Sequence, residues 1–263
     1  MTMASVTLAA SEQGEGPPLV ILHGLFGSAQ NWGSVAKRLA ASHRVIAADL
    51  RNHGSSPHTA AMDYPAMAAD VAALIEARAD GRAAVMGHSM GGKVAMTLAL
   101  TRPVLVERLI VVDIAPVPYR VALGAHAAAL KALPLAPGMR RAEADAALRA
   151  VVESDAKRAF LLQNLRFEGD GPPRWRINLD AIAANMPVIA GFPEFPPQAR
   201  YEGPTLLVSG ETSGYVGPEH RDAMLALFPR TVFVVVPGAG HWVQTEAPEP
   251  FLRAVVPFLA MPG

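Results

Sequence analysis

Short apolar runs recur along the chain, and most are followed by a turn and then by a segment with helical spacing. Runs that are apolar at nearly every position are typical of strands buried on both faces of a sheet. Because such runs alternate with helical patterns here, we predict a mainly parallel sheet with helices on both faces. The predicted strands are 19–22, 44–49, 83–86, 108–112, 205–209 and 231–236, and the predicted helices are 31–41, 64–79, 90–100, 218–228 and 248–259. Residues 3–9 are expected to form an edge strand and residues 11–18 a polar turn.

The alternation stops after Asp113. Residues 114–118 read I-A-P-V-P, which ends the preceding strand, and mostly helical patterns follow. The candidate helices are 121–133, 142–154, 156–167 and 179–186. We therefore expect residues 1–116 and 201–263 to form the core, and residues 117–200 to form an inserted helical cap that packs over the sheet.

Composition narrows the classes that this chain can belong to. It has 263 residues, of which 51% are hydrophobic, which suits one large domain with an insertion. A net charge of zero does not favour a nucleic-acid partner. Cysteine is absent and no histidine pair has the spacing of a zinc site, so we expect no disulfide, no metal and no cofactor. The chain shows no secretory pattern and no apolar run of membrane-spanning length, so the expected location is cytoplasmic. The oligomeric state is not indicated.

A short motif, G-H-S-M-G at residues 87–91, joins the predicted strand at 83–86 to the predicted helix at 90–100. The pattern G-x-S-x-G at such a junction is typical of a serine nucleophile on a sharp, strained turn. Gly87 and Gly91 leave room for that turn, and the first N–H groups of the helix point toward the serine. Ser89 is therefore the candidate nucleophile.

The same stretch also resembles a phosphate-binding P-loop, since residues 87–94 read G-H-S-M-G-G-K-V. A P-loop needs Ser or Thr after its lysine to hold magnesium. Here Val94 follows Lys93, and Val94 cannot bind a metal. A nucleotide-binding module, with Asp113 as its magnesium partner, is thus a disfavoured alternative.

A serine nucleophile needs a base and an oxyanion hole. His241 is the candidate base, because it follows the last predicted strand in a glycine-flanked loop, and sites in parallel sheets form at the carboxyl ends of strands. The backbone N–H groups of Met90 and Leu25 are the candidate oxyanion donors. The alternatives are a loop-capping role for His241 and an ordinary turn at residues 23–24.

Four segments together resemble the α/β-hydrolase superfamily and, within it, the YbfF-type esterases. They are H-G-L-F-G-S at 23–28, D-L-R-N-H-G-S-S at 49–56, the motif at 87–91 and V-D-I-A-P at 112–116. The resemblance extends over nearly the whole chain. It implies an α/β-hydrolase fold with a helical cap, and hydrolysis of small-molecule acyl esters or thioesters.

The resemblance leaves the acid of the catalytic triad open. The superfamily usually places this acid in the loop that here reads G-E-T-S-G at residues 210–214, and Ser213 matches the usual aspartate. Serine can orient a histidine by a hydrogen bond but supplies no charge. Asp113 is the favoured replacement, with Ser213 and Glu211 as alternatives. Asp113 could instead cap the loop that leads into the insertion.

Other side chains are candidates for substrate contact. Phe26 and Trp242 are candidates to line the acyl pocket, although either could belong to the core. Arg51, Lys93 and Arg120 could meet an anionic substrate. Carbon–carbon bond hydrolysis, a cofactor-free peroxidase reaction on the same triad, and an inactive binding scaffold remain alternative functions.

Overall fold

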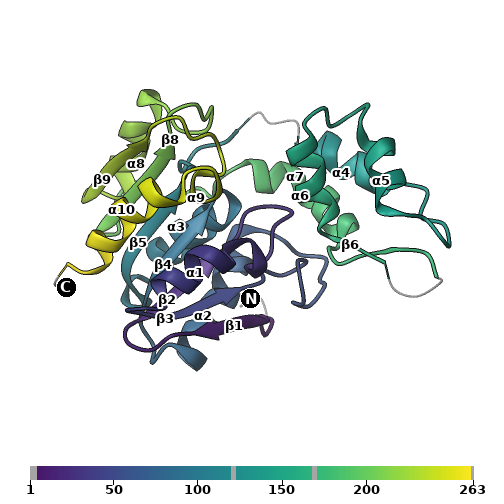
Figure 1. The fold of residues 1–263 in the computed structure, drawn as a ribbon. Helices are drawn as coiled ribbons and strands as arrows, with labels where there is room; N and C mark the ends of the chain where they lie inside the picture. The colour runs from purple at the N-terminus through teal and green to yellow at the C-terminus, as the bar shows by residue number, and fades with distance from the viewer. Residues whose placement is uncertain (1–4, 120–122, 168–170, 262–263) are drawn as a thin grey trace.

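The computed structural model describes residues 5–119, 123–167 and 171–261. Within these ranges the core is a seven-stranded sheet of order β1-β3-β2-β4-β5-β8-β9, in which β1 pairs antiparallel and the other pairs are parallel (Figure 1). The strands are β1 Ala10–Gln13, β2 Pro18–Leu22, β3 Arg44–Ala48, β4 Ala83–His88, β5 Val106–Val112, β8 Thr205–Gly210 and β9 Thr231–Val236. The predicted mainly parallel sheet is confirmed.

Helices cover both faces of the sheet. They are α1 Gly33–Leu39, α2 Tyr64–Arg78, α3 Met90–Thr101, α8 Arg221–Leu227, α9 Val243–Glu246 and α10 Pro248–Leu259, with short 3-10 turns at Ala29–Trp32, Pro103–Leu105 and Pro218–His220. On β2, Val20 and Leu22 pack toward α2, α3 and α8, whereas Leu19 and Ile21 pack toward α1 and α10. All four side chains are fully buried. Because the inner strands of the sheet are buried on both faces, they are apolar at most positions and could be predicted from the sequence.

The edge strand lies further along the chain than predicted. The strand expected at 3–9 is wrong over its described part, residues 5–9, and β1 forms at residues 10–13, of which 11–13 were expected to belong to a polar turn. β1 pairs with β3, with Ala10 opposite Ala48, and its side chains are half-buried or exposed. An edge strand needs backbone pairing on one side only, so polar residues suffice and no apolar run marks the strand.

Between β5 and β8 the chain forms a helical lobe beside the sheet, here called the insertion (Figure 1). It contains α4 Leu123–Lys131, α5 Arg141–Leu148, α6 Asp155–Leu162 and α7 Leu179–Ala190, with a ribbon of β6 Leu165–Arg166 and β7 Arg174–Trp175. The helix expected at 156–167 is wrong at its end, because the chain turns into β6. Strands this short show no periodicity in the sequence. Residues 121–122, the expected start of the first helix, lie outside the described residues.

The insertion lies over the loops that follow the carboxyl ends of the strands. Asn164 Nδ2 donates a hydrogen bond of 2.7 Å to Phe26 O, in the loop after β2. The ring of Phe160, on α6, lies 5.5 Å from the ring of Trp242, in the loop after β9. The insertion therefore covers the edge of the sheet where sites form in α/β proteins.

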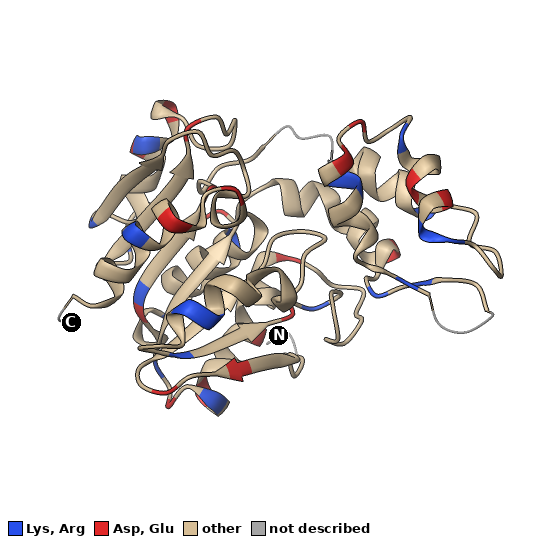
Figure 2. Ribbon diagram, viewed as in Figure 1, with Lys and Arg blue, Asp and Glu red and all other residues tan. Residues whose placement is uncertain are grey.

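Charged residues of both signs are mixed along the core and the insertion (Figure 2). Several pair with each other at the surface, as Arg38 does with Glu249 and Arg102 with Glu76. This arrangement agrees with the net charge of zero. None of the helices in the described ranges combines the length and the apolar character needed to cross a bilayer.

Candidate active site

Ser89 lies at the sharp turn between β4 and α3, as the motif predicts. Its φ of 53° and ψ of −118° form a conformation that costs a non-glycine residue about 1–3 kcal/mol. Packing requires both flanking glycines: a Cβ on Gly87 would lie 2.1 Å from Gly91 O, and a Cβ on Gly91 would lie 2.5 Å from His23 O. The strand and the helix therefore hold Ser89 on a fixed turn, where the residue is half-buried.

Asp113 directly follows β5, the neighbour of β4 in the sheet, and it is completely buried. Its Oδ2 accepts a hydrogen bond of 2.7 Å from His241 Nδ1, and its Oδ1 accepts one of 3.0 Å from Gly210 N–H. A buried carboxylate is tolerated when donors surround it in this way. Because the carboxylate accepts from Nδ1, the Nε2 of His241 is left without a proton and can act as a base.

His241 is held by two further rings. The ring of Tyr215 stacks on its imidazole, with the centroids 3.9 Å apart and an interplanar angle of 21°. His88, the residue before Ser89, donates from Nε2 to His241 O at 2.9 Å. Burial lowers the pKa of His88 well below its ordinary value, so His88 stays neutral and fixes the main chain of His241. The stacked tyrosine was not expected from the sequence, and an aromatic face stabilises an imidazolium when one forms.

Ser213 contacts Asp113 rather than His241. Its Oγ donates to Asp113 Oδ2 and accepts a hydrogen bond of 3.2 Å from Tyr215 N–H. The two positions considered for the acid therefore belong to one network, in which Asp113 is the direct partner of the histidine. Glu211, the third candidate, is exposed.

The sheet places Ser89 close to the hydrogen-bond network of Asp113, His241 and Ser213. Ser89 N–H donates at 3.0 Å to Val112 O, the carbonyl that precedes Asp113. The ring of His88 lies 4.7 Å from the ring of His241. Among the hydrogen bonds of the described residues, none joins Ser89 to His241. Such bonds are often long in the free enzyme and shorten when substrate binds.

The loop after β2 contains the predicted oxyanion donor Leu25. Phe26, which follows it, has a φ of 61°, and its N–H donates to His53 Nε2 at 3.1 Å. The N–H groups of Leu25 and Met90 have no acceptor among the described residues. Both are therefore available to bind an oxyanion.

Two buried histidines tie this loop to the loop after β3, and the loop itself lies against the nucleophile turn. In both His23 and His53, Nε2 accepts from a backbone N–H, and Nδ1 donates to a backbone carbonyl. Burial lowers the pKa of His23 to about 4 and that of His53 to about 3, so both rings are neutral at pH 7. A Cβ on Gly24 would lie 3.3 Å from Ser89 Cβ, which shows how closely the loop approaches the turn.

The two aromatic candidates for the acyl pocket lie in different surroundings. Phe26 is 3% exposed and packs within the apolar cluster of the core. Trp242 is half-buried, and its ring lies between those of His241, at 6.2 Å, and Phe160 of the insertion. Trp242 therefore stands at the junction of the core, the insertion and the candidate site.

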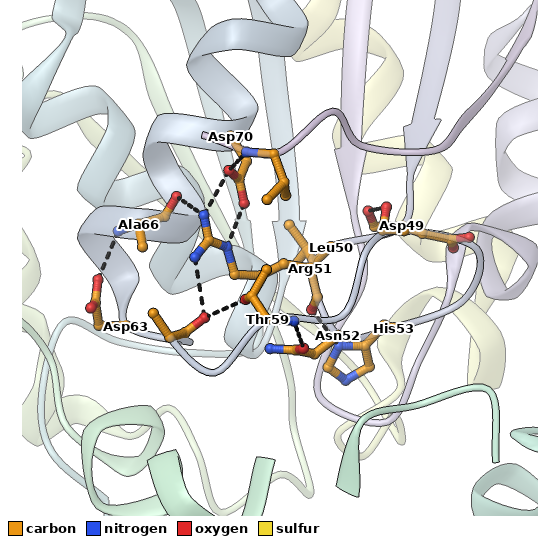
Figure 3. Close-up of polar contacts among 12 residues, drawn as sticks. Asp49, Leu50, Arg51, Asn52, His53, Thr59, Asp63, Ala66 and Asp70 are labelled. Atoms are coloured by element: carbon orange, nitrogen blue, oxygen red, sulfur yellow. Dashed lines mark hydrogen bonds and ion pairs between the residues drawn. The ribbon is translucent and has the colours of Figure 1, made fainter. Parts of the chain in front are cut away.

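Arg51 is not available to a substrate, so that expectation is wrong. Its Nε and Nη2 bind the two carboxylate oxygens of Asp70 at 2.6 and 2.7 Å, and its remaining donors reach Ala61 O and Ala66 O (Figure 3). Both charged side chains are buried. The pair ties the loop after β3 to α2. Arg120 lies outside the described residues.

Lys93 also has other partners than a phosphate. Its Nζ donates to Val117 O at 2.8 Å, to Ala190 O at 3.2 Å and to Gly191 O. The structure therefore does not support a P-loop or an anion contact at this lysine. In the ranges that the structure describes, no group of three or more His, Asp or Glu side chains is placed to hold a metal ion.

Comparison with known proteins agrees with this fold. A family model described as alpha/beta hydrolase fold matches residues 17–248. The chain belongs to the α/β-hydrolase family. Within it, the chain is 37% identical over 265 residues to esterase YbfF of Escherichia coli (strain K12), covering 95% of this chain and 96% of that protein. The predicted fold class and the resemblance to YbfF-type esterases are confirmed.

Two further similar proteins are named as a lipase and an esterase. The chain is 43% identical over 252 residues to the sn-1-specific diacylglycerol lipase ABHD11 of Mus musculus, covering 93% of this chain and 81% of that protein. A solved structure described as a marine microorganism esterase is 36% identical, with a TM-score of 0.93 and coverage of 97% of this chain and 100% of its own. Both names describe enzymes that act on esters.

Proposed function

We propose that this chain is a serine hydrolase that cleaves carboxylic esters of small acyl substrates through an acyl-enzyme on Ser89. One observation carries the proposal: the buried Asp113 binds His241 Nδ1 at 2.7 Å, at the end of the strand next to the strained Ser89 turn. The names of the relatives, esterase and lipase, add support.

In the first half of the reaction, Ser89 Oγ attacks the acyl carbon while His241 Nε2 takes the hydroxyl proton. The carbonyl oxygen becomes negative, and the N–H groups of Leu25 and Met90 bind it. The buried carboxylate of Asp113 and the stacked ring of Tyr215 stabilise the imidazolium. The tetrahedral intermediate then collapses, and the leaving alcohol takes the proton from His241.

In the second half, His241 removes a proton from water, and the resulting hydroxide attacks the acyl carbon of the acyl-enzyme. Collapse of this intermediate releases the carboxylic acid and returns the proton to Ser89 Oγ. The same steps apply to a thioester, in which a thiol leaves. Esters are the favoured class, because the relatives are named for ester hydrolysis. We also propose a cytoplasmic location, because a chain without cysteine needs no oxidising compartment for its fold. Cell fractionation tests this location.

The test of the function is a panel of p-nitrophenyl and coenzyme A esters of increasing acyl length, assayed with the wild type and with Ser89→Ala. We expect the wild type to hydrolyse the esters, and Ser89→Ala to lose about 10³-fold or more of kcat. A fluorophosphonate probe should add its mass to the wild-type protein at Ser89 and not to the variant. If Ser89→Ala keeps the wild-type rate, the proposed mechanism is wrong.

A further inference from the structure

Lys93 is a buried cation that the proposed mechanism does not use. It lies on α3, one helical turn after Ser89, and it is 1% exposed. Among the described residues, no carboxylate lies within ion-pair distance of it. Its three hydrogen bonds go to the carbonyls of Val117, Ala190 and Gly191. An ammonium group has three N–H donors, so each donor has one acceptor.

These carbonyls belong to the two places where the insertion joins the core. Val117 lies in the entry stem, residues 114–119, which leads from β5 toward the insertion. Ala190 and Gly191 lie in the exit stem, residues 189–191, at the end of α7. The last carbonyls of a helix lack intrahelical partners and form the negative end of its dipole, so a cation is favoured there.

Neighbouring groups complete the arrangement. Tyr64 on α2 donates from its hydroxyl to Ile189 O at 2.6 Å, and Tyr119 N–H of the entry stem donates to Ala190 O at 2.8 Å. The rings of Tyr64 and Tyr119 lie 5.8 and 4.8 Å from Lys93 Nζ. The ammonium is thus placed near two aromatic rings, and the exit stem is bonded to α2, α3 and the entry stem.

We propose that Lys93 is a positioning residue that clamps the entry and exit stems together, and that it thereby sets how closely the insertion covers the active site. The proposal rests on the proposed function for its consequence, not for the clamp itself. Phe160 of the insertion contacts Trp242, the neighbour of His241. A shift of the stems would therefore move Phe160 relative to the active site. Ser89, by contrast, depends on β4 and α3 and stays in place.

The charged form of Lys93 is costly to bury, and its hydrogen bonds to the two stems offset that cost. Burial lowers the pKa of Lys93 to about 7, which means that the folded protein disfavours the charged form relative to water. A neutral amine has only two N–H donors for the three carbonyls. An apolar residue of similar length would avoid the desolvation cost, but it would remove the lysine donor from the carbonyls of Val117 and Gly191, whereas Ala190 O would keep the N–H of Tyr119. What Lys93 contributes is a fixed distance between the stems.

The test compares Lys93→Met with Thr97→Val, a buried control on the same helix whose hydroxyl bonds only within α3. Hydrogen exchange is measured for peptides that contain Tyr119 and the end of α7. In Lys93→Met we expect these peptides to exchange about tenfold faster or more, since the stem carbonyls lose a charged donor, while peptides from β4 and β5 are unchanged. Thr97→Val should match the wild type.

The second readout is acyl selectivity, measured as kcat/KM for p-nitrophenyl octanoate divided by that for the acetate. We expect this ratio to fall about fivefold in Lys93→Met through a higher KM for the octanoate, with kcat for the acetate within about twofold of the wild type. Lys93→Arg, which keeps the charge and the donors, should recover part of the ratio.

The clamp is overturned if Lys93→Met folds and the exchange of both stems is unchanged, or if all esters lose activity equally while the stems stay protected. Should Lys93→Met fail to fold, Tyr64→Phe tests the same stem without removing a buried charge. Faster exchange at the end of α7 with a lower octanoate ratio supports the clamp, and no change in either contradicts it. Hydrogen exchange needs no activity, so a wild type that cleaves no ester would refute the proposed function and leave the clamp testable.

Discussion

The sheet core and the insertion are held together in different ways. In the core, strands such as β2 and β5 are buried on both faces and contribute side chains to the apolar layers on either side of the sheet. The insertion shares the apolar layer on the α2–α3 side, but it also depends on hydrogen bonds to the backbone, such as Asn164 Nδ2 to Phe26 O and Asn178 N–H to Asn52 O. The proposed catalytic residues Ser89, Asp113 and His241 belong to the core. Phe160, which is proposed to affect acyl selectivity, belongs to the insertion. Rate and selectivity should therefore respond to different substitutions.

The largest expected effect separates the acid from its neighbour within the core. Asp113→Asn should lower kcat by about 10³–10⁴-fold, because an amide supplies no charge to the imidazolium and can hold the wrong tautomer. Ser213→Ala should cost tenfold or less, about 1.4 kcal/mol, since Ser213 bonds to Asp113 and not to His241. Kinetics with p-nitrophenyl acetate measure both. An Asp113→Asn enzyme near the wild-type rate, with a crippled Ser213→Ala, would refute the assignment of the acid.

The next effect concerns the stability of the core. Arg51→Met leaves the buried Asp70 carboxylate without its partner and should lower the free energy of unfolding by about 3–5 kcal/mol. Arg38→Met removes the exposed partner of Glu249 and should leave the urea midpoint almost unchanged. Urea titrations at pH 7 compare the two variants. Equal midpoints would show that the buried pair is not a main support of the loop after β3.

Low pH should weaken the loop that contains Leu25, the predicted oxyanion donor. Folding lowers the pKa of His23 from 6.5 to about 4, so between these values the unfolded chain binds a proton that the folded chain does not. Stability contributed by the neutral ring is thus present above pH 6.5 and is lost as the pH falls toward 4, by on the order of 2–3 kcal/mol. Urea midpoints from pH 7 to pH 4 measure the loss. His53→Gln should flatten this dependence, because folding also lowers the pKa of His53, whereas the exposed His58→Gln should not.

The smallest expected effect belongs to the insertion. Phe160→Ala removes the ring that contacts Trp242 and should raise KM for p-nitrophenyl octanoate about three- to fivefold, with kcat for the acetate little changed. Phe167→Ala, which truncates an exposed ring of the insertion, is the matched control and should leave KM as it is. If Phe160→Ala instead lowers kcat equally for the octanoate and the acetate, acyl selectivity and catalytic rate do not depend on separate regions.

The buried strands and the G-x-S-x-G turn could be predicted from the sequence because each is a local signal. Apolar runs mark β2, β3, β4, β5, β8 and β9, and two glycines mark the turn at Ser89. β1 and the β6–β7 ribbon give no such signal, since the first is polar and the second is very short. The position of β1 follows from its pairing with β3, which sequence periodicity does not report.

The candidate site could be predicted in part. The placement of Asp113 and His241 at the ends of strands in one parallel sheet indicated that they would meet, and their roles in catalysis stay predictions. The hydrogen-bond partners of Arg51 and Lys93 could not be predicted from the sequence. They lie on α2 and at the ends of the insertion, which come close to these side chains only in the folded chain. The same holds for the ring of Tyr215, which stacks on His241 from a loop whose path the sequence does not specify.

The hydrogen bond between Ser213 and Asp113 has a consequence for how this family can diverge. The hydroxyl of Ser213 and the Nδ1 of His241 bind the same carboxylate oxygen, so both positions face one corner of the site. A chain with aspartate at both positions would place two carboxylates side by side, where like charges favour the protonation of one and leave the other to bind the histidine. The double substitution Asp113→Asn with Ser213→Asp therefore tests whether the acid can be moved from the end of β5 to the loop after β8.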